Sequence, residues 1–447
     1  MSRYNYPYRI SFFQFLLHSS EITKNPIRFH HKYFSQSKDD SFSIKPFFSK
    51  PIILTRDAVL ARHILQKHHK VYEKSKLQTK FLSRYLGYGL LTSVGDYWLQ
   101  QRRLIQPGFH KEKINNLVAI INSTVNEQVN TIKTGSFVAL YPIMNELAFE
   151  VVAKSLFNYS AEKQTLKRLQ IIIETLQKFI VKDIRQPHKR FWYALKGYFK
   201  HHMKLVAESR QIINAIIEER RQSKETHDDL LDMLLNAQYE DGTSMTNNQL
   251  IDEILILFVA GHETTANALT FTLFLLANNK SEFIKAQNES ITITNNAKAL
   301  ESLPKLNYIK QCIEESMRLY PSAWITDRIA LEDDVLGNYQ IKKGTLIGVS
   351  IYEMHRNTTY WSHAERFQPE RFSEENKKET SAFYMPFGAG PRLCIGNNFA
   401  MYEMMLTINA IINKFDIETN KTEVKLNPLI TLKPVDVELK LIFRSYA

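Results

Sequence analysis

The stretch FGAGPRLCIG, from Phe387 to Gly396, decides the fold of this chain because it sets a single cysteine in a glycine-rich loop. Three glycines and a proline surround Cys394, and an apolar run with helical periodicity, NNFAMYEMMLTINAIINKF, follows at once. A thiolate close to a helix N-terminus is stabilised by backbone N–H groups and by the helix dipole. Arg392 can offer a charge-assisted fork to a carboxylate. The loop therefore predicts a thiolate that ligates a metal; the simpler alternative is a helix-capping loop with an incidental cysteine.

The spacing Phe-x-x-Gly-x-Arg-x-Cys-x-Gly, which this loop meets at every fixed position, resembles the haem-binding loop of the cytochromes P450. The resemblance spans about Ser11 to the C-terminus. It implies haem b (iron protoporphyrin IX) as the cofactor, with Cys394 as the axial ligand that supplies a thiolate to the iron. It further implies that Phe387 packs near the sulfur and that Arg392 binds a haem propionate.

The stretch AGHETT, Ala260–Thr265, interrupts the densest apolar run, Leu250–Ala277, whose length and lack of a polar face predict a helix buried on all sides. Glu263 is an acid without an evident partner in that run, and such local violations often mark function. A threonine that bonds back to the preceding turn can bend a helix, so a kinked core helix is the structural alternative. The resemblance implies that Gly261 leaves room for dioxygen and that Glu263 and Thr264 are catalytic, relaying protons.

The pair His262-Glu263 also begins a His-Glu-x-x-His zinc helix, but the fifth position is Ala266. The nearby chain offers no replacement ligand, which argues against a zinc site in this helix.

Four more residues are expected to contact the cofactor by resemblance. Trp98 and Arg102 share one face of a predicted helix, and both are expected to reach haem propionates. Arg328 matches a further propionate-binding arginine, and His355 matches another contact of this kind.

A second set of charged residues is expected to be structural. Glu315 and Arg318 are three residues apart on a predicted helix and can pair, although a pair of this kind is common at surfaces. The resemblance adds Arg371, from the segment Pro369-Glu370-Arg371-Phe372, and implies an ion network of the three residues that braces the haem loop.

The rest of the chain favours one large helical domain. Its 447 residues are 44% hydrophobic and 23% charged, and no linker or repeat divides them. An early helix is expected over Ser11–Phe34, helical periodicity dominates from Asp57 to about Ile291, and strands are expected at about 40–56, 322–350 and 425–447. We therefore expect a single domain, residues 1–447, that is mainly α with a small β-rich flank, and the resemblance implies the cytochrome P450 fold.

Net charge and cysteine content bound the partners and the compartment. The formal net charge of +12 fits a solvated basic surface, an acidic protein partner or an anionic membrane, and no basic arm or motif points to nucleic acid. Two cysteines make a disulfide framework improbable and favour a reducing compartment. The apolar run Ile10–Leu17 is too short to span a bilayer, and the lack of an acidic residue before Glu21 leaves a mitochondrial transit peptide open. We expect a soluble, cytoplasmic protein without a membrane span.

By resemblance, the reaction is the insertion of one oxygen atom of dioxygen into a C–H bond or across a double bond, hydroxylation or epoxidation. The substrate is expected to be lipophilic, like a fatty acid, a steroid or a terpenoid. The expected pocket combines the loop after the early helices, the central helix, the turn after Pro321 and a late hairpin: Phe81, Tyr85, Leu90, Phe258, Ala260, Ala323, Trp324, Ile325 and Ile430. The aromatic and basic stretch Phe191–Met203 is either a lid that touches a membrane peripherally or an ordinary amphipathic surface helix.

Electrons are expected from a separate protein, in a three-component system without a fused reductase. The basic balance favours an acidic ferredoxin or flavodoxin with its reductase. Three alternatives remain: a peroxide-driven peroxygenase, a haem-thiolate isomerase or dehydratase, and a non-catalytic haem-based sensor. The acid–alcohol pair Glu263-Thr264 disfavours the first two.

Overall fold

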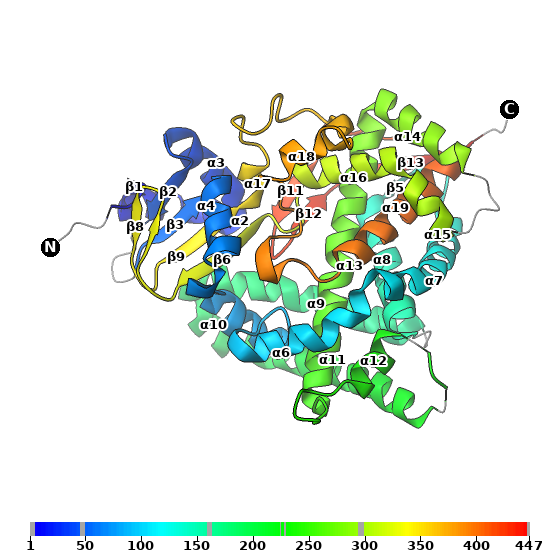
Figure 1. Cartoon of the computed structure of the whole chain (residues 1–447), viewed down its shortest axis with the longest axis horizontal. Coiled ribbons are helices and arrows are strands. Elements are labelled where there is room, and N and C mark those ends of the chain that lie inside the picture. The colour runs from blue at the N-terminus through cyan, green and yellow to red at the C-terminus, as the bar shows by residue number, and fades with distance from the viewer. Residues whose placement is uncertain are drawn as a thin grey trace.

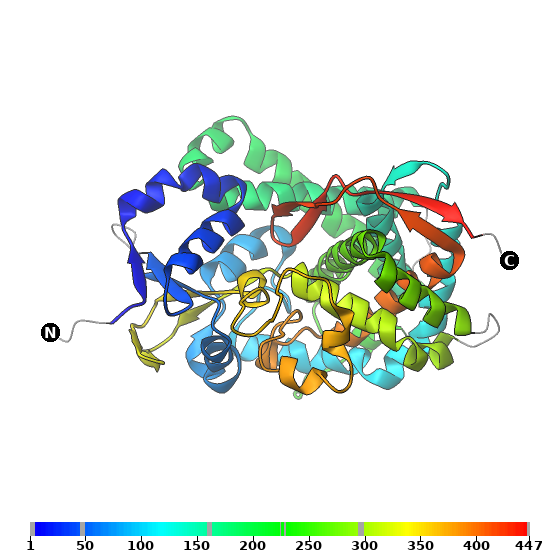
Figure 2. The same cartoon turned by 90° about the horizontal axis from the view of Figure 1, so that it is seen from above.

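One long helix, α13 (Asn247–Asn278), runs through a body of helices, and a mixed β-sheet forms the opposite flank (Figure 1). The computed structural model describes residues 5–44, 50–158, 163–223, 225–227, 229–293 and 299–444. The N-terminus lies at the sheet end of the molecule and the C-terminus at the helical end (Figure 2).

Helix α13 begins at a capping box, in which the side chains of Thr246 and Gln249 each accept a hydrogen bond from the backbone N–H of the other. Most of its side chains are buried, and it packs against helices on several sides. At Gly261 the neighbouring helix comes so close that an added Cβ would lie 3.0 Å from a methyl carbon of Val152. One helix of the described chain, α13, is long and apolar enough to cross a membrane, and 83% of its most apolar window is buried inside the protein.

Seven further long helices belong to the helical body: α7 (Lys111–Asn130), α8 (Leu140–Phe157), α9 (Lys163–Arg185), α11 (Tyr198–Gln222), α14 (Lys280–Thr292), α16 (Asn307–Leu319) and α19 (Asn397–Lys414). The shorter helices are α1 (Phe12–Leu17), α2 (Ser19–Lys24), α3 (Pro26–Gln36), α4 (Ala58–Arg62), α5 (Ser83–Leu86), α6 (Gly95–Ile105), α10 (Arg190–Leu195), α12 (Leu230–Asn236), α15 (Ala299–Ser302), α17 (Ile351–Met354) and α18 (Lys377–Thr380). Single turns occur at η1 (His63–Lys67) and η3 (Leu77–Leu82), both of π type, and at the 3₁₀ turns η2 (His69–Val71), η4 (Gln106–Phe109), η5 (Pro187–Lys189), η6 (Leu303–Lys305), η7 (Pro369–Phe372) and η8 (Gly390–Arg392).

The main sheet has the strand order β1-β2-β3-β9-β6-β4, and three smaller sheets are ordered β10-β13-β5, β11-β12 and β7-β8. In the main sheet β3 is parallel to β9, with Ile52 opposite Leu346, and β6 is antiparallel to β9. The strands are β1 (Tyr8–Ile10), β2 (Ser41–Ile44), β3 (Ile52–Thr55), β4 (Tyr72–Glu73), β5 (Phe137–Ala139), β6 (Ile325–Ala330), β7 (Asp334–Leu336), β8 (Tyr339–Ile341), β9 (Leu346–Ser350), β10 (Phe415–Glu418), β11 (Lys425–Pro428), β12 (Leu432–Val435) and β13 (Glu438–Phe443).

These elements confirm the mainly α fold class and the β-rich flank, within the described part of the three expected ranges; positions 45–49 and 445–447 lie outside it. The expectation of one early helix was wrong, because α1, α2 and α3 are separate. Helix α2 ends at Lys24, and Pro26 begins a new helix after Asn25, since proline fits the first turn of a helix but not its interior.

Candidate active site

The cysteine loop is held in a fixed conformation by its own backbone. The amide of Cys394 donates to the carbonyl of Phe387 at 3.0 Å, and that of Leu393 donates to Gly390 at 2.9 Å. Gly390 has a φ of +72°, and a Cβ there would lie 1.9 Å from the carbonyl oxygen of Leu65. Only glycine fits this approach of the loop to η1.

Cys394 combines an exposed surface with a thiol that the surrounding protein desolvates. The residue is exposed by surface area, yet burial raises the pKa of its thiol, while the Gly396 amide and Arg102 act in the opposite direction. The expected stabilisation of negative sulfur by backbone amides is present, but burial outweighs it. A thiol in this setting becomes a thiolate on binding a metal, since a coordinating thiol is deprotonated outright.

Four cations lie around this loop. Lys74, Arg328 and Arg392 repel one another, and Arg102 donates to the carbonyl of Leu393 at 3.0 Å. Burial first, and then the two arginines, lowers the pKa of Lys74 well below its ordinary value. Burial, and then Arg328, lowers that of Arg392 to about 10. None of the four forms an ion pair with a carboxylate among the described residues.

Trp98, which the sequence predicts as a cofactor contact, lies against one of these cations. The Arg392 guanidinium lies 4.0 Å from the centroid of the Trp98 ring and donates to the Ser93 carbonyl at 3.3 Å. Arg328 donates to Thr326 at 3.3 Å and to the Asp327 carbonyl at 2.6 Å, contacts that are local to its own strand.

The donor set fits haem b. Cys394 would supply a thiolate to the iron, and two propionate carboxylates would neutralise the unpaired cations. On the central helix, Ala260 is exposed, and Gly261 and Thr264 beside it are partly exposed, although most of the helix is buried. When bound, haem supplies the activation of dioxygen; the protein supplies the thiolate, the propionate partners and the polar groups of α13.

Glu263 is a paired acid, contrary to the unpaired acid expected from the sequence. Its carboxylate lies 3.2 Å from the Lys433 ammonium and accepts a hydrogen bond from the Thr431 hydroxyl. Both partners come from the hairpin of β11 and β12, which the helical pattern of α13 cannot reveal. Thr264 and Thr265 bond back to the carbonyls of Ala260 and Gly261, at 2.7 and 2.9 Å.

The structure brings Glu315, Arg318 and Arg371 together. Arg318 forms two hydrogen bonds with the Glu315 carboxylate, at 2.7 and 2.9 Å, and Arg371 reaches the same carboxylate at 3.3 Å. Arg318 is fully buried and also donates to the carbonyls of His355, Ala364 and Arg366. The network thus joins α16 to the segment that precedes the cysteine loop.

His355, expected to contact a propionate, is bound up within the protein core. The ring is fully buried, its Nε2 accepts from the Met385 amide at 2.9 Å, and it stacks on Tyr384. Burial, and then Arg318, lowers the pKa of His355 to about 3. A neutral core histidine replaces the expected cofactor contact.

Two of the expected pocket residues face the core instead. Phe258 is fully buried between Phe149 and Phe157, whose ring centroids lie 5.3 and 4.8 Å away. It lies about 200° around the helix from Ala260, so the two side chains cannot face one pocket. Trp324 is buried, and its indole N–H donates to the Leu429 carbonyl at 3.2 Å.

The remaining pocket residues are dispersed. Ala260 and Ala323 are exposed, whereas Leu90, Ile325 and Ile430 are partly buried. Further out, the Arg190 guanidinium lies 4.6 Å from the centroid of the Phe81 ring, and the Tyr85 hydroxyl donates to Asp183 at 3.3 Å. Phe81 and Tyr85 therefore contact the region of α9 and α10.

Sequence reasoning missed Lys74 and Glu253. The Lys74 ammonium donates to the carbonyls of Leu90 and Leu91 at 2.9 and 2.7 Å, and the Glu253 carboxylate accepts from the Leu90 amide at 2.8 Å. Burial raises the pKa of Glu253 to about 8. Glu253 carries a sequence signal, an acid inside the apolar run of α13, whereas Lys74 is one of several lysines in a basic segment.

Known proteins resemble this chain over most of its length. A family model described as "Cytochrome P450" matches residues 5–441. The chain is 27% identical over 399 residues to the protein LUTEIN DEFICIENT 5, chloroplastic, of Arabidopsis thaliana, covering 83% of this chain and 66% of that protein. It is 32% identical over 414 residues to a cytokinin hydroxylase of Arabidopsis thaliana, covering 86% of this chain and 77% of that protein. The crystal structure of a cytochrome P450, CYP102L1, superposes with a TM-score of 0.82 at 25% identity, covering 94% of this chain and 95% of that one.

Proposed function

Because the chain belongs to the cytochrome P450 family of monooxygenases, we propose that it is a haem-thiolate enzyme that inserts one oxygen atom of dioxygen into a lipophilic substrate. The proposal covers two reactions, hydroxylation and epoxidation. The relative named cytokinin hydroxylase supports the first. The proposal includes Cys394 as the axial ligand, and Trp98, Arg102, Arg328 and Arg392 as contacts of the cofactor.

One observation carries the proposal: a buried, cation-rich site surrounds a single thiol. Burying Lys74 and Arg392 beside Arg328 costs free energy, because burial first and repulsion between the cations second lower the pKa of Lys74 and that of Arg392. A dianionic ligand beside Cys394 would offset that cost. Haem b, with two carboxylates and an iron that accepts a thiolate, meets both demands.

Glu263 and Thr264 would serve as the proton relay. The Thr264 hydroxyl donates to the Ala260 carbonyl. The hydroxyl oxygen keeps lone pairs that can accept a hydrogen bond from a donor such as water. Glu263 faces Lys433 and Thr431, so it can exchange a proton with this polar cluster and pass it towards Thr264 through a turn of its side chain or through water. The relay therefore depends on residues of both α13 and the β11–β12 hairpin.

We propose a lipophilic substrate of the fatty-acid, steroid or terpenoid kind. The pocket residues that remain after the corrections are mostly apolar: Leu90, Ala260, Ala323, Ile325 and Ile430, with Phe81 and Tyr85 further out. A screen for changes of the iron spin state against these three classes tests this part.

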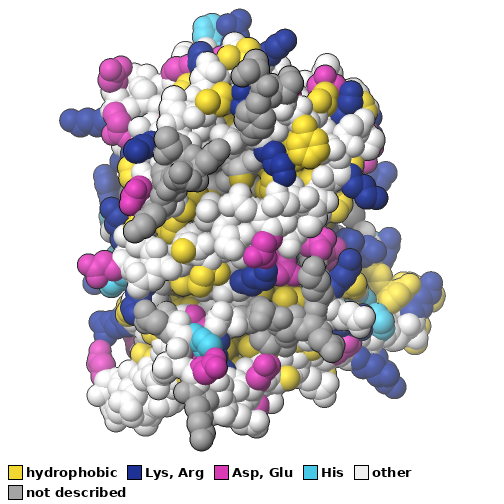
Figure 3. All heavy atoms as spheres, turned by 90° about the vertical axis from the view of Figure 1, so that its right-hand side faces the viewer, with side chains coloured by type: hydrophobic (Ala, Val, Ile, Leu, Met, Phe, Trp, Pro, Cys, Tyr) yellow, Lys and Arg dark blue, Asp and Glu magenta, His cyan; other side chains and the backbone are white. Residues whose placement is uncertain are grey.

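We propose that the electrons come from an acidic ferredoxin or flavodoxin with its reductase. Arg103 is exposed on α6, where it pairs with Glu240, and Lys67 of η1 and Lys70 of η2 are exposed. The helical end of the molecule, in contrast, mixes both signs of charge (Figure 3). Steering by opposite charges weakens with salt, so turnover with an acidic ferredoxin should fall as ionic strength rises. A rise would contradict this docking.

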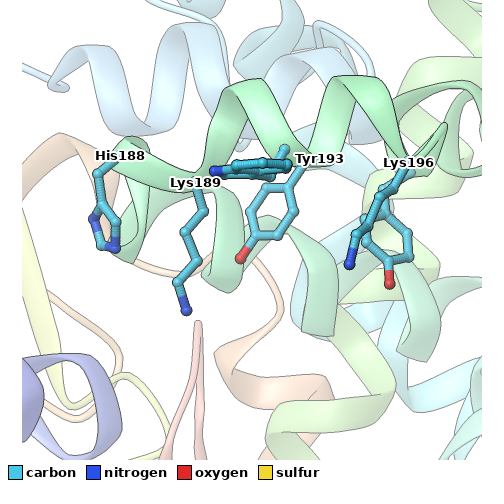
Figure 4. Close-up of a pocket in the computed structure, with 6 residues that line it drawn as sticks. His188, Lys189, Tyr193 and Lys196 are labelled. Carbon is cyan, nitrogen blue, oxygen red and sulfur yellow. The ribbon is translucent and has the colours of Figure 1, made fainter.

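Peripheral contact with a membrane is also proposed. Phe191, Trp192 and Leu195 of α10 are 68%, 59% and 63% exposed, and Phe13 and Leu17 of α1 are 72% and 83% exposed. A surface hollow of about 500 Å³ is lined by His188, Lys189, Trp192, Tyr193, Lys196 and Tyr198. The labelled side chains of η5 and α10 point to the same side (Figure 4). Aromatic and basic side chains on one short helix fit an anionic lipid surface.

Sedimentation with anionic vesicles tests this contact. A variant with Phe191→Ser and Leu195→Ser should bind less, and Ile284→Ser, an exposed hydrophobic residue of α14, is the matched control. Equal binding of both variants would contradict the contact.

We propose a cytoplasmic location because Cys312 and Cys394 are free thiols, which suits a reducing compartment.

The oxygenase reaction itself is tested with isotopic dioxygen and a surrogate redox system. The proposal predicts one labelled oxygen atom in the product and no product without electrons. Product without dioxygen would indicate an isomerase, product with peroxide alone a peroxygenase, and the absence of any product a haem-based sensor.

A further inference from the structure

Two histidines and an aspartate outside the cysteine site form a second cluster of metal-ligating side chains. His63 and His68 come from η1 and its C-terminal end, and Asp334 from β7. One ligand atom from each residue lies within 4.8 Å of those of the other two. We refer to these three residues as the His-His-Asp cluster.

The local backbone brings the two histidines together. In an α-helix, side chains five residues apart lie about 140° apart around the axis. Here η1 is a π turn, closed by a hydrogen bond of 2.8 Å from the His68 amide to the His63 carbonyl. The two imidazoles consequently stack, with 3.9 Å between ring centroids and an interplanar angle of 18°. Single π turns inside helices occur frequently at functional sites.

The ligand atoms are near each other but are not yet at metal-site distances. The His63 Nε2 lies 2.8 Å from one Asp334 oxygen, a hydrogen-bond distance, and the His68 Nδ1 lies 3.9 Å from the other, too far for a hydrogen bond. In a tetrahedral site with zinc–ligand distances of about 2.1 Å, ligand atoms lie about 3.4 Å apart. Metal binding therefore requires small shifts of the two imidazoles, and the side chain of His68, 49% exposed, can move.

A second layer of contacts holds the carboxylate in place. The Tyr72 hydroxyl donates to Asp334 Oδ2 at 2.7 Å, and the Val335 amide donates to Oδ1 at 2.8 Å. Ligating carboxylates in metalloproteins are oriented by such outer contacts.

We propose that the His-His-Asp cluster binds a divalent late first-row transition metal, with zinc as the representative ion. Two imidazoles and one carboxylate suit zinc, nickel or copper rather than magnesium or calcium, which prefer oxygen ligands alone. Three protein ligands leave a fourth position for water, and the exposed side of His68 faces solvent.

The site lies directly behind the cysteine loop. The carbonyl of Leu65, inside η1, is the atom that approaches Gly390 of that loop. A metal that clamps His63 to His68 spans the turn that contains Leu65. Metal binding should therefore make η1, which supports the cysteine loop, more rigid.

The test uses the haem-loaded protein, stripped with a chelator and then dialysed against zinc. We expect about one zinc per haem iron by elemental analysis, and a single binding event by calorimetry. The variant His68→Gln should weaken zinc binding by at least about tenfold. It should fold normally because His68 is exposed. Zinc should raise the melting temperature of the original protein and leave that of His68→Gln unchanged.

His69→Gln is the matched control. This histidine follows in sequence, but its Nδ1 bonds to the Gln66 carbonyl at 2.8 Å and it takes no part in the cluster. Zinc binding that is absent from the original protein, or that His69→Gln weakens as much as His68→Gln does, would overturn the proposal. Asp334→Asn provides a third arm, since it removes the anionic ligand and should also weaken binding.

Discussion

Glu263 of the central helix and Lys433 of β12 form a buried ion pair, with 3.2 Å between the carboxylate oxygen and the ammonium nitrogen. The side chains are 1% and 10% exposed. The pair ties the acid of the AGHETT stretch to a hairpin that begins more than a hundred residues later. Any change at Lys433 should therefore act on the central helix.

Lys433→Met should lower the free energy of unfolding by about 3 kcal/mol, because it leaves a buried charge without its partner. Urea denaturation measures this value. Adding Glu263→Gln to the same chain should restore most of the loss, since a neutral amide needs no counter-charge. Additive losses in the double variant would contradict the pairing.

Lys74→Met should weaken haem retention, because it removes one of the cations that we propose to bind the haem propionates. A hydrogen bond to a charged group contributes about 1.5–3 kcal/mol, so transfer of haem to apomyoglobin should be roughly tenfold faster or more. Lys76→Met, at an exposed lysine nearby, should transfer haem at the original rate. Equal rates for both variants would exclude Lys74 from the site.

Glu253→Gln should stabilise the protein at alkaline pH. Burial raises the pKa of Glu253 to about 8 in the folded protein, from an ordinary value of 4.5. Between these values the folded state keeps a proton that the unfolded chain has lost, so stability falls as pH rises through this range. Glutamine can still accept from the Leu90 amide and does not titrate. We expect a melting temperature roughly 2–4 °C above that of the original protein at pH 8.5 and little difference near pH 4.5; a difference that does not change with pH would argue against the raised pKa.

Arg318→Lys should destabilise the fold by about 3–5 kcal/mol despite keeping the charge. Lysine cannot reproduce the two bonds to Glu315 together with the three to backbone carbonyls. The measurement is chemical denaturation of the haem-free and haem-loaded protein. Arg366→Lys, at an exposed position, is the control and should change stability by less than about 0.5 kcal/mol.

Motifs with fixed spacing identified those residues of the proposed site that lie on single elements. The Cys394 loop, the α13 motif and the Glu315–Arg318 pair are local patterns, and the strength of a helical period was sufficient to place α13 within a few residues. Partners that come from distant segments were not predictable in this way. Lys433 and Lys74 reach the site only because β12 and the segment before η3 fold against it.

Phe258 and Trp324, which we expected in the pocket, lie elsewhere for the same physical reason, namely the direction of the side chain. Phe258 is near the motif in sequence but about 200° from Ala260 around the helix, and this angle alone argues against a shared pocket. Trp324 directly precedes β6, and its indole N–H donates to the Leu429 carbonyl, so it packs towards the β11–β12 hairpin. For His355 no such local rule exists, because its burial depends on Tyr384 and Trp361.

The central claim, that Cys394 ligates haem iron, is tested most directly by the absorption spectrum of the reduced, carbon-monoxide-bound protein beside that of Cys394→Ala. Thiolate ligation predicts a strongly red-shifted Soret band in the original protein that disappears in the variant. A band at the position typical of histidine-ligated haem, or a red-shifted band that persists in Cys394→Ala, would contradict the claim.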